Sequence, residues 1–276
     1  MEDTRRDDEF LLLLLSDANL PTGSFVASSG FEAHAAHGLL RTSSDALVDT
    51  LAFVRSSVLS YGSNSLPFMR DAHACVRQFA EGTRSETSAL EVLGALDALC
   101  DAGTLNHVAR RASRAQGVAL LTLYSKGFAV KQGDKFIALI DALKLRVRRD
   151  ELPGHLPVCW GVLTGALGLS ADRAAHLHLF LHARALYSAA IRMNALGPYA
   201  AQHALLHHIR PLVDDAIAQT AHLRTGILDH SDLQDQDEED DDAAFARAAI
   251  MPANTWPLGE LIQGRHDQLH SRIFNS

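Results

Sequence analysis

Apolar residues return at intervals of three and four along most of the chain, and this spacing limits the possible folds more than any other feature. A stripe of that kind covers one face of an α-helix, whereas a half-buried strand alternates in steps of two. In TSSDALVDTLAFVRSSVLSYG, for example, Leu47, Leu51, Val54 and Val58 share one face. Aromatic residues make up only 6% of the chain, so Leu and Ala, which both favour helices, build most of the core. We therefore predict an all-α protein, with about nine or ten helices in a single helical domain.

Residues that cap or break helices divide the periodic pattern into segments. The glycines and prolines of DELPGHLPVCWGVLTGALGLS interrupt a buried apolar stretch, where small residues allow helices to approach closely. The helices that we expect begin at Ser43 or Ser44 and end at Gly62, span 65–79 with Ser65 as the cap, begin at Thr83 or Ser88 and end at Gly103, span 105–126 and 134–149, run from a Ser170 cap to a break at Gly197 and Pro198, and continue to about His222 with a bend near Pro211.

Negative charge is concentrated in one short run. The net charge of −8 comes almost entirely from DQDEEDDD at residues 235–242. Such a run buries too little apolar surface to offset the entropy lost on ordering. We divide the chain into a helical domain at 1–228, a flexible acidic loop at 229–242 and a C-terminal tail at 243–276, in which helical spacing returns. A tail tethered in this way either docks back on the body or becomes ordered only on a partner.

The sequence also argues against an oxidising compartment, a membrane segment and a nucleic-acid partner. Three scattered cysteines, Cys75, Cys100 and Cys159, form neither a zinc-binding motif nor a disulfide framework, which favours a reducing, cytoplasmic compartment. The apolar run FLLLLL near the start is too short to span a bilayer and has acidic flanks, so we expect a buried first helix and no membrane segment. The basic clusters are short and are not interleaved with aromatic residues, so we expect no nucleic-acid partner.

The sequence offers little that indicates catalysis. It contains no motif for nucleotide binding, for a serine nucleophile or for a zinc protease, so we predict no enzyme, no catalytic residue and no cofactor. Several of the 15 histidines lie one helical turn apart, which places two imidazoles on one face as half of a nickel or zinc site. Because no nearby cysteine or carboxylate completes a dense cluster, we assign no metal ligand. The pairs are His34 with His37, His178 with His182, His203 with His207, and His266 with His270.

The stretch LPTGSFVASSGFEAH at residues 20–34 is rich in small residues, although it follows the apolar first helix. Three interpretations are open: a cradle for an anion, a loop whose close packing excludes larger side chains, or a surface that another protein approaches. No Lys or Arg lies within the stretch to support an anion. The residues alone therefore favour the tight loop or the docking surface.

The same stretch resembles the motif Leu-Pro-x-Gly-Ala/Ser-Phe/Tyr-x-x-Ser-x-Gly-Leu/Phe-Glu near the start of the UreF family of urease accessory proteins. Four further segments are similar to blocks of that family and occur in the same order. They are ARRASRAQG at 109–117, GHLPVCWGVLTGALGLS at 154–170, RMNALGPYAAQHALL at 192–206 and RHDQLHSRIFNS at 265–276. The resemblance extends over residues 11–276.

The resemblance implies a homodimeric adaptor without catalytic activity. Such an adaptor bridges the accessory protein D or H to the nickel-carrying GTPase G and delivers that GTPase to apo-urease. It also implies that the tail is ordered by the D/H protein, and that Glu32 is accessible near the surface that meets the GTPase. The candidate partner-binding residues at matching positions are Gly23, Ser24, Phe25, Ser28, Gly30 and Glu32 in the first motif, and Arg272 and Phe274 in the tail.

Two alternative functions remain open. One is a chaperone that binds nickel through its own histidines. The other is a protein that modulates GTP hydrolysis by its partner, which would require a residue that reaches the nucleotide.

Overall fold

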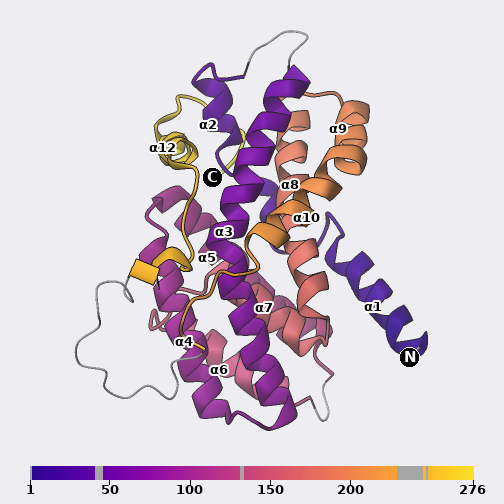
Figure 1. The fold of residues 1–276 in the computed structure, drawn as a ribbon, viewed down its shortest axis with the longest axis vertical. Helices are drawn as coiled ribbons and strands as arrows, with labels where there is room; N and C mark the ends of the chain where they lie inside the picture. Colours follow the sequence, from indigo (N-terminus) through magenta and orange to yellow (C-terminus); the bar gives the residue numbers. More distant parts are fainter. Residues whose placement is uncertain (1, 41–45, 131–133, 229–244, 247) are drawn as a thin grey trace.

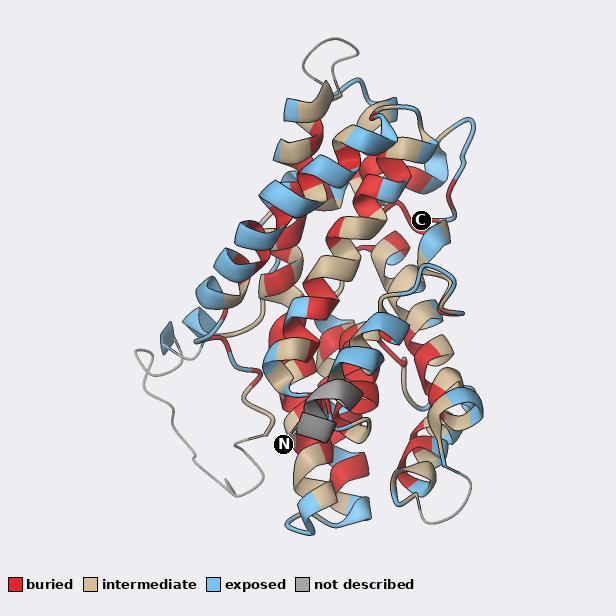
Figure 2. Ribbon diagram, turned by 90° about the vertical axis from the view of Figure 1, so that its right-hand side faces the viewer, coloured by how far each residue is buried: buried red, intermediate tan, exposed pale blue. Residues whose placement is uncertain are grey.

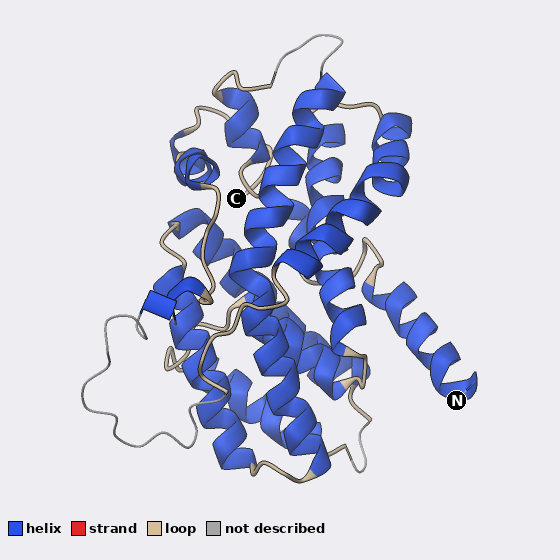
Figure 3. Ribbon diagram, viewed as in Figure 1, coloured by secondary structure: helices blue, strands red, loops and turns tan. Residues whose placement is uncertain are grey.

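The computed structural model describes residues 2–40, 46–130, 134–228, 245–246 and 248–276. These residues form helices joined by loops, with no strand among them, so the predicted all-α fold is confirmed (Figure 3). In the same ranges, no helix combines the length and the apolar character needed to cross a membrane. The predicted acidic loop at 229–242 lies outside the described residues.

Most of the helices overlap predicted segments, although α3 (Ala46–Glu81) spans two of them. The helices are α1 (Glu2–Leu15), α2 (Phe31–Ala36), α3 (Ala46–Glu81), α4 (Glu86–Gly103), α5 (His107–Leu123), α6 (Phe136–Arg148), α7 (Leu156–Ala166), α8 (Ala171–Arg192), α9 (Pro198–Ala204), α10 (Arg210–Gln219) and α12 (Pro257–Gly264), with the short helical segments η1 (Ser24–Val26), η2 (Tyr124–Phe128), η3 (Leu205–Ile209) and η5 (His266–Gln268).

The longest helix, α3, runs through the centre of the molecule and contacts α4, α7, α8 and α10 (Figure 1). The predicted break at Gly62 is wrong, because α3 continues through this residue. A Cβ at Gly62 would lie 3.7 Å from side-chain atoms of Leu179 in α8 and Ala216 in α10, so two helices pack against the glycine. Ser65 caps no new helix, since its Oγ donates to the carbonyl oxygen one turn earlier (2.6 Å). Tertiary packing here outweighs the low helix propensity of glycine.

Helix α7 lies in the middle of the bundle and packs against α3 and α5. A Cβ at Gly161 in α7 would lie 2.4 Å from the carbonyl oxygen of Met69 in α3. A Cβ at Gly117 in α5 would lie 2.1 Å from the carbonyl oxygen of Gly154, just before α7. Both distances are far below van der Waals contact, so only glycine fits without a shift of the helices. The structure therefore agrees with the prediction that small residues allow close helix packing here.

Local capping signals located helix starts with mixed accuracy. The Ser170 side chain caps α8 as predicted. Helix α4 is capped by Ser85 and not by Thr83 or Ser88, because the Ser85 Oγ accepts a hydrogen bond from the Ser88 amide (3.2 Å). Neighbouring hydroxyl residues can each cap a helix, and the packing of the helix selects one of them.

Buried residues face the centre of the bundle and exposed residues face outward (Figure 2). At one end of the bundle α12 packs against α2, and the C-terminus of the chain lies beside them, whereas α6 lies at the opposite end (Figure 1). Since α2 follows directly on the loop at 20–30, the small-residue stretch and the tail meet at this end.

Candidate functional site

The chain between α1 and α2 makes a tight turn against α12. Gly23 (φ 73°), Ser29 (φ 49°) and Gly30 (φ 87°) have the left-handed backbone conformation, which glycine adopts most readily. A Cβ at Gly30 would lie only 3.0 Å from the Cβ of Gln263 in α12, so the close approach of α12 also favours glycine there. Of the interpretations of residues 20–34, this geometry supports a loop whose close packing excludes larger side chains.

The end of the tail closes on this loop through backbone hydrogen bonds. The Ser28 amide donates to the Ser276 carbonyl oxygen (2.5 Å), and the Asn275 amide donates to the Val26 carbonyl oxygen (2.8 Å). We call the unit formed by residues 22–32 and 265–276 the loop–tail junction. In the single chain the tail is thus packed on the body, while its ordering by a partner stays a prediction.

Glu32 binds the tail from inside the junction. Its carboxylate accepts hydrogen bonds from the amides of Ile273 (Oε1, 2.6 Å) and Phe274 (Oε2, 3.1 Å). Only 5% of Glu32 is exposed, and Ser28 is fully buried. The expectation that Glu32 is accessible to a partner is therefore wrong, because this carboxylate is occupied by the chain's own tail.

Phe274 is the apolar anchor of the tail. It is buried, and the guanidinium of Arg192 in α8 lies 4.3 Å from the centroid of its ring. Arg192 also donates to the carbonyl oxygen of Phe25. On the other side, Nε2 of the buried His266 donates to the Phe274 carbonyl oxygen (3.2 Å). The guanidinium of Arg192 thus contacts both the loop, at Phe25, and the tail, at Phe274.

A cluster of charges lies at the outer side of the junction. Asp267 accepts two hydrogen bonds from Arg111 of α5 (2.9 Å each) and one from Arg272 (3.1 Å). Arg111 also donates to the carbonyl oxygen of Asn275 (2.9 Å), which ties the tail to α5. The hydrogen bonds and the charge of Arg111 lower the pKa of Asp267 to about 2, so this carboxylate is ionised at neutral pH.

The junction contains all eight residues predicted for partner binding, although Glu32 and its bonding partner Ile273 are 241 positions apart in sequence. The eight differ in exposure, since Phe25 and Arg272 expose their side chains while others form the interior. The buried ones are Ser28, Gly30, Glu32 and Phe274, and Gly23 and Ser24 are partly exposed.

None of the four residues that hold the junction together was predicted as a partner-binding residue. These are Arg111, Arg192, His266 and Asp267. All four lie in segments that resemble family blocks, and His266 also belongs to one of the histidine pairs, which are the only signals that pointed toward them. Nothing in the sequence indicates that they pair, because a contact between distant segments leaves no local pattern.

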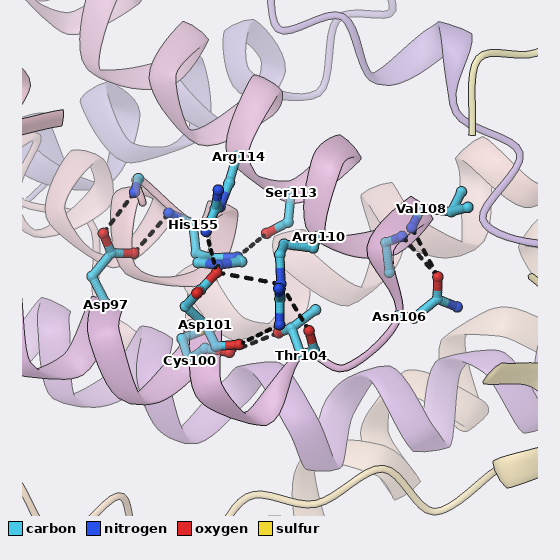
Figure 4. A network of polar contacts seen from close by, with 12 residues as sticks. Asp97, Cys100, Asp101, Thr104, Asn106, Val108, Arg110, Ser113, Arg114 and His155 are labelled. Atoms are coloured by element: carbon cyan, nitrogen blue, oxygen red, sulfur yellow. Dashed lines mark hydrogen bonds and ion pairs between the residues drawn. The ribbon is translucent and has the colours of Figure 1, made fainter. Parts of the chain in front are cut away.

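Two of the family-like segments, 109–117 and 154–170, meet in a polar network between α4, α5 and α7 (Figure 4). The Asp97 carboxylate accepts hydrogen bonds from two successive amides, of which the second is that of His155 (2.6 and 2.7 Å), and burial raises its pKa. The buried His155 ring lies 3.0 Å from Ser113 Oγ and 2.9 Å from Asp101 Oδ1, and Asp101 also pairs with Arg114 (2.5 Å). These groups are engaged in fixing α7 against its neighbours, so we assign the network a structural role.

A cavity of about 250 Å³ extends from the loop at 20–29 to α8 and α12. His178 and His182 line it, and their rings stack on Tyr61 with centroid distances of 5.1 and 4.1 Å. Burial lowers the pKa of His178 to about 3 and that of His182 to about 4, so both rings are neutral at neutral pH. Within the part of the chain that the structure describes, no group of three or more His, Cys, Asp or Glu is placed to hold a metal ion.

The chain is similar to known proteins over nearly its whole length. A family model described as UreF matches residues 48–208. Urease accessory protein 6 of Cryptococcus neoformans var. grubii is 39% identical over 308 residues, with 96% of each chain covered. A protein of Schizosaccharomyces pombe named uncharacterized urease accessory protein UreF-like is 30% identical over 271 residues, again with 96% of each chain covered. The urease accessory protein UreF of Paenarthrobacter aurescens is 29% identical over 268 residues, which cover 97% of this chain and 98% of that relative.

Proposed function

The chain belongs to the UreF family, and from this premise we propose that it is a non-enzymatic adaptor in the maturation of urease. Relatives in fungi and in a bacterium bear the name of urease accessory proteins. As partners we assign the accessory protein D or H, the nickel-carrying GTPase G and, through their complex, apo-urease. In this proposal the protein acts in the cytoplasm as a homodimer.

The observation that supports this proposal best is the loop–tail junction. Its interior is closed by the chain's own hydrogen bonds, whereas apolar side chains of the loop, the tail and the neighbouring α12 are exposed. These are Phe25 (61% exposed), Leu258 (55%), Leu261 (71%) and Ile273 (56%). Apolar anchors beside an arginine are typical of protein interfaces. Side chains that a hydrogen-bonded backbone already holds in place lose less entropy on binding.

Within the junction we assign the tail to the D/H protein and the loop to the GTPase. Glu32 connects these two parts, because it lies in α2 and accepts hydrogen bonds from the tail backbone. We infer that the D/H protein stabilises the docked tail, and with it the loop that the GTPase meets. The adaptor then works through binding free energy alone.

The Arg272→Ala variant tests the tail assignment. Arg272 is 44% exposed in the single chain, where it reaches Asp267. We expect the guanidinium to become buried and paired at the D/H interface, so its removal weakens that binding by about 2 to 5 kcal/mol. Titration calorimetry of the purified D/H protein with each variant measures the change.

The matched control is Leu145→Ala, which truncates an exposed side chain of α6 at the opposite end of the molecule. This variant should bind the D/H protein as the unmodified chain does. Equal affinities for Arg272→Ala and Leu145→Ala would contradict the assignment of the tail.

A further inference from the structure

His178 has a buried ring nitrogen, Nε2, that finds no hydrogen-bond partner in the described part of the chain. Only 4% of this residue is exposed, and it lines the cavity of about 250 Å³ that extends from the loop at 20–29 to α8 and α12. Its ring stacks on Tyr61, and the ring of Trp160 lies beside it, with the centroids 5.7 Å apart. Buried polar atoms almost always have a partner, so an unpaired nitrogen beside a cavity indicates a ligand or ordered water.

The volume of the cavity limits the size of a ligand. A cavity of about 150 Å³ holds one benzene molecule, so about 250 Å³ admits a molecule of about ten non-hydrogen atoms. Pockets for drug-sized molecules are larger, at roughly 300 to 1,000 Å³. The cavity therefore fits a compound with a single ring.

The walls of the cavity combine flat rings with uncharged polar groups. They include the rings of Tyr61, Trp160, His178 and Trp256 and the side-chain amides of Asn64 and Gln116. Rings of this kind favour contact with a flat apolar surface, whereas side-chain amides both donate and accept hydrogen bonds. A planar molecule that carries an amide group matches both properties.

The charges around the cavity favour an uncharged ligand. Among the described residues that line it, Asp17, Arg184 and Glu260 carry a charge, and each already has a polar partner within the chain. Because burial lowers the pKa values of His178 and His182, both rings are neutral at neutral pH. A charged molecule would thus lose its hydration without gaining a partner for its charge.

The tail supplies one wall of the cavity. Trp256 and Gln263 belong to the segment 254–263 and line it, opposite residues of α3, α5 and α8. This segment is attached to α3, because Trp256 packs on the ring of Phe53 (5.0 Å between centroids) and the Thr255 amide donates to Ser60 Oγ (3.1 Å). A molecule in the cavity would contact the body and the tail together, so its binding stabilises the docked tail.

We propose that the cavity is a binding site for one small uncharged molecule, a planar amide, which hydrogen-bonds to Nε2 of His178 and is enclosed by the tail segment 254–263. Binding of this molecule favours the docked tail and thereby the loop–tail junction. The effect on partner proteins rests on the proposed function, whereas the binding itself is a property of the single chain.

Three probes of nearly the same shape test the site on the unmodified full chain: benzamide is uncharged, benzoate is negative and benzamidine is positive. Nitrogen NMR of the chain with ¹⁵N-labelled histidine follows each titration at neutral pH. We expect benzamide to bind saturably at one site and to shift the Nε2 resonance of His178, and the two charged probes to bind about tenfold more weakly or less. Equal binding of all three probes, or no shift of that resonance with benzamide, overturns the proposal and leaves a cavity that holds water only.

His178→Phe removes Nε2 and keeps an aromatic ring, so benzamide should bind about three- to tenfold more weakly. His178→Asn keeps an uncharged hydrogen-bonding group and should recover part of the affinity. The matched control is His222→Ala, which removes an exposed imidazole and should bind benzamide as the unmodified chain does. Far-ultraviolet circular dichroism establishes that the variants keep their helical content, and equal affinities of His178→Phe and His222→Ala would exclude the hydrogen bond to His178.

Hydrogen exchange tests the enclosure by the tail. Benzamide should slow the exchange of the amides at 254–263 in the unmodified chain and have little effect on them in His178→Phe at the same concentration. Exchange at 254–263 that is unchanged by saturating benzamide would contradict the coupling to the tail. Complex formation with the accessory partners is a separate measurement, so failure of this site leaves the adaptor function to be judged on its own.

Discussion

At the scale of single residues, the stacked rings of Tyr61, His178 and His182 connect burial with protonation. Each imidazole here stays neutral, because a protonated ring would lose its hydration without gaining a carboxylate that compensates the charge. His182 Nε2 lies 2.9 Å from Ser57 Oγ, whereas Nε2 of His178 has no hydrogen-bond partner among the residues that the structure describes. The sequence places these two histidines on one helix face. It does not reveal that Tyr61, from another helix, closes the stack.

The stack predicts how stability changes with pH. The pKa values of His178 and His182, about 3 and about 4, lie below the value of about 6.5 for an unfolded histidine. As the pH falls from about 6.5 toward 4, the unfolded chain takes up protons that the folded chain does not, so the free energy of unfolding decreases. Each histidine contributes a slope of up to about 1.4 kcal/mol per pH unit.

His178→Phe isolates this contribution. The phenyl ring keeps the stack on Tyr61 but takes up no proton, so the slope in this pH window should fall by about 1.4 kcal/mol per unit. Urea unfolding at several pH values measures the slope. His222→Ala, which changes an exposed histidine, should leave the slope nearly unchanged. A slope in His178→Phe equal to that of the unmodified chain would show that His178 is not buried as a neutral ring.

At the scale of helices, the periodic pattern predicted most of the elements. Glycine was the least reliable indicator of where a helix ends. Gly103 ends a helix as expected, whereas Gly62 lies inside one. A hydroxyl residue, Ser63 or Thr104, follows each glycine, and the difference arises from the helices that pack on Gly62. Glycines at helix crossings are therefore packing residues, although a sequence analysis takes them for breaks.

Gly117 offers a direct test of this packing role. In Gly117→Ala, the new Cβ would lie 2.1 Å from the Gly154 carbonyl oxygen, which forces α5 and α7 apart. We expect a loss of about 1 to 3 kcal/mol in the free energy of unfolding, or more if the polar network around His155 is disrupted. Gly103→Ala, where a Cβ meets no atom of the described residues within 4 Å, should change stability by less than about 0.5 kcal/mol. Denaturant unfolding measures the stability of both variants. Equal stabilities of Gly117→Ala and Gly103→Ala would contradict the close packing of α5 against the start of α7.

At the scale of the whole molecule, the fold brings the stretch at 20–34 next to the tail. The sequence predicted both segments as candidate sites from their similarity to family blocks, but not that they bind each other. Residues 22–32 have no local feature that matches residues 265–276. Their pairing depends on a carboxylate that meets backbone amides, and every residue supplies a backbone amide. For the same reason Glu32 was expected at the surface and lies inside the junction.

The central claim is that this molecule acts by presenting the loop–tail junction to other proteins. Glu32→Ala tests it, because two tail amides lose their acceptor and the tail should detach while the helical bundle stays folded. Hydrogen exchange of the tail amides establishes that detachment, and Leu145→Ala serves as the control.

The most direct measurement is size-exclusion chromatography after co-expression with the D/H protein and the GTPase. We expect the unmodified chain and Leu145→Ala to elute in one complex with both partners, and Glu32→Ala to elute without the GTPase. Co-elution of Glu32→Ala with both partners at full stoichiometry, or failure of the unmodified chain to join either partner, would contradict the central claim.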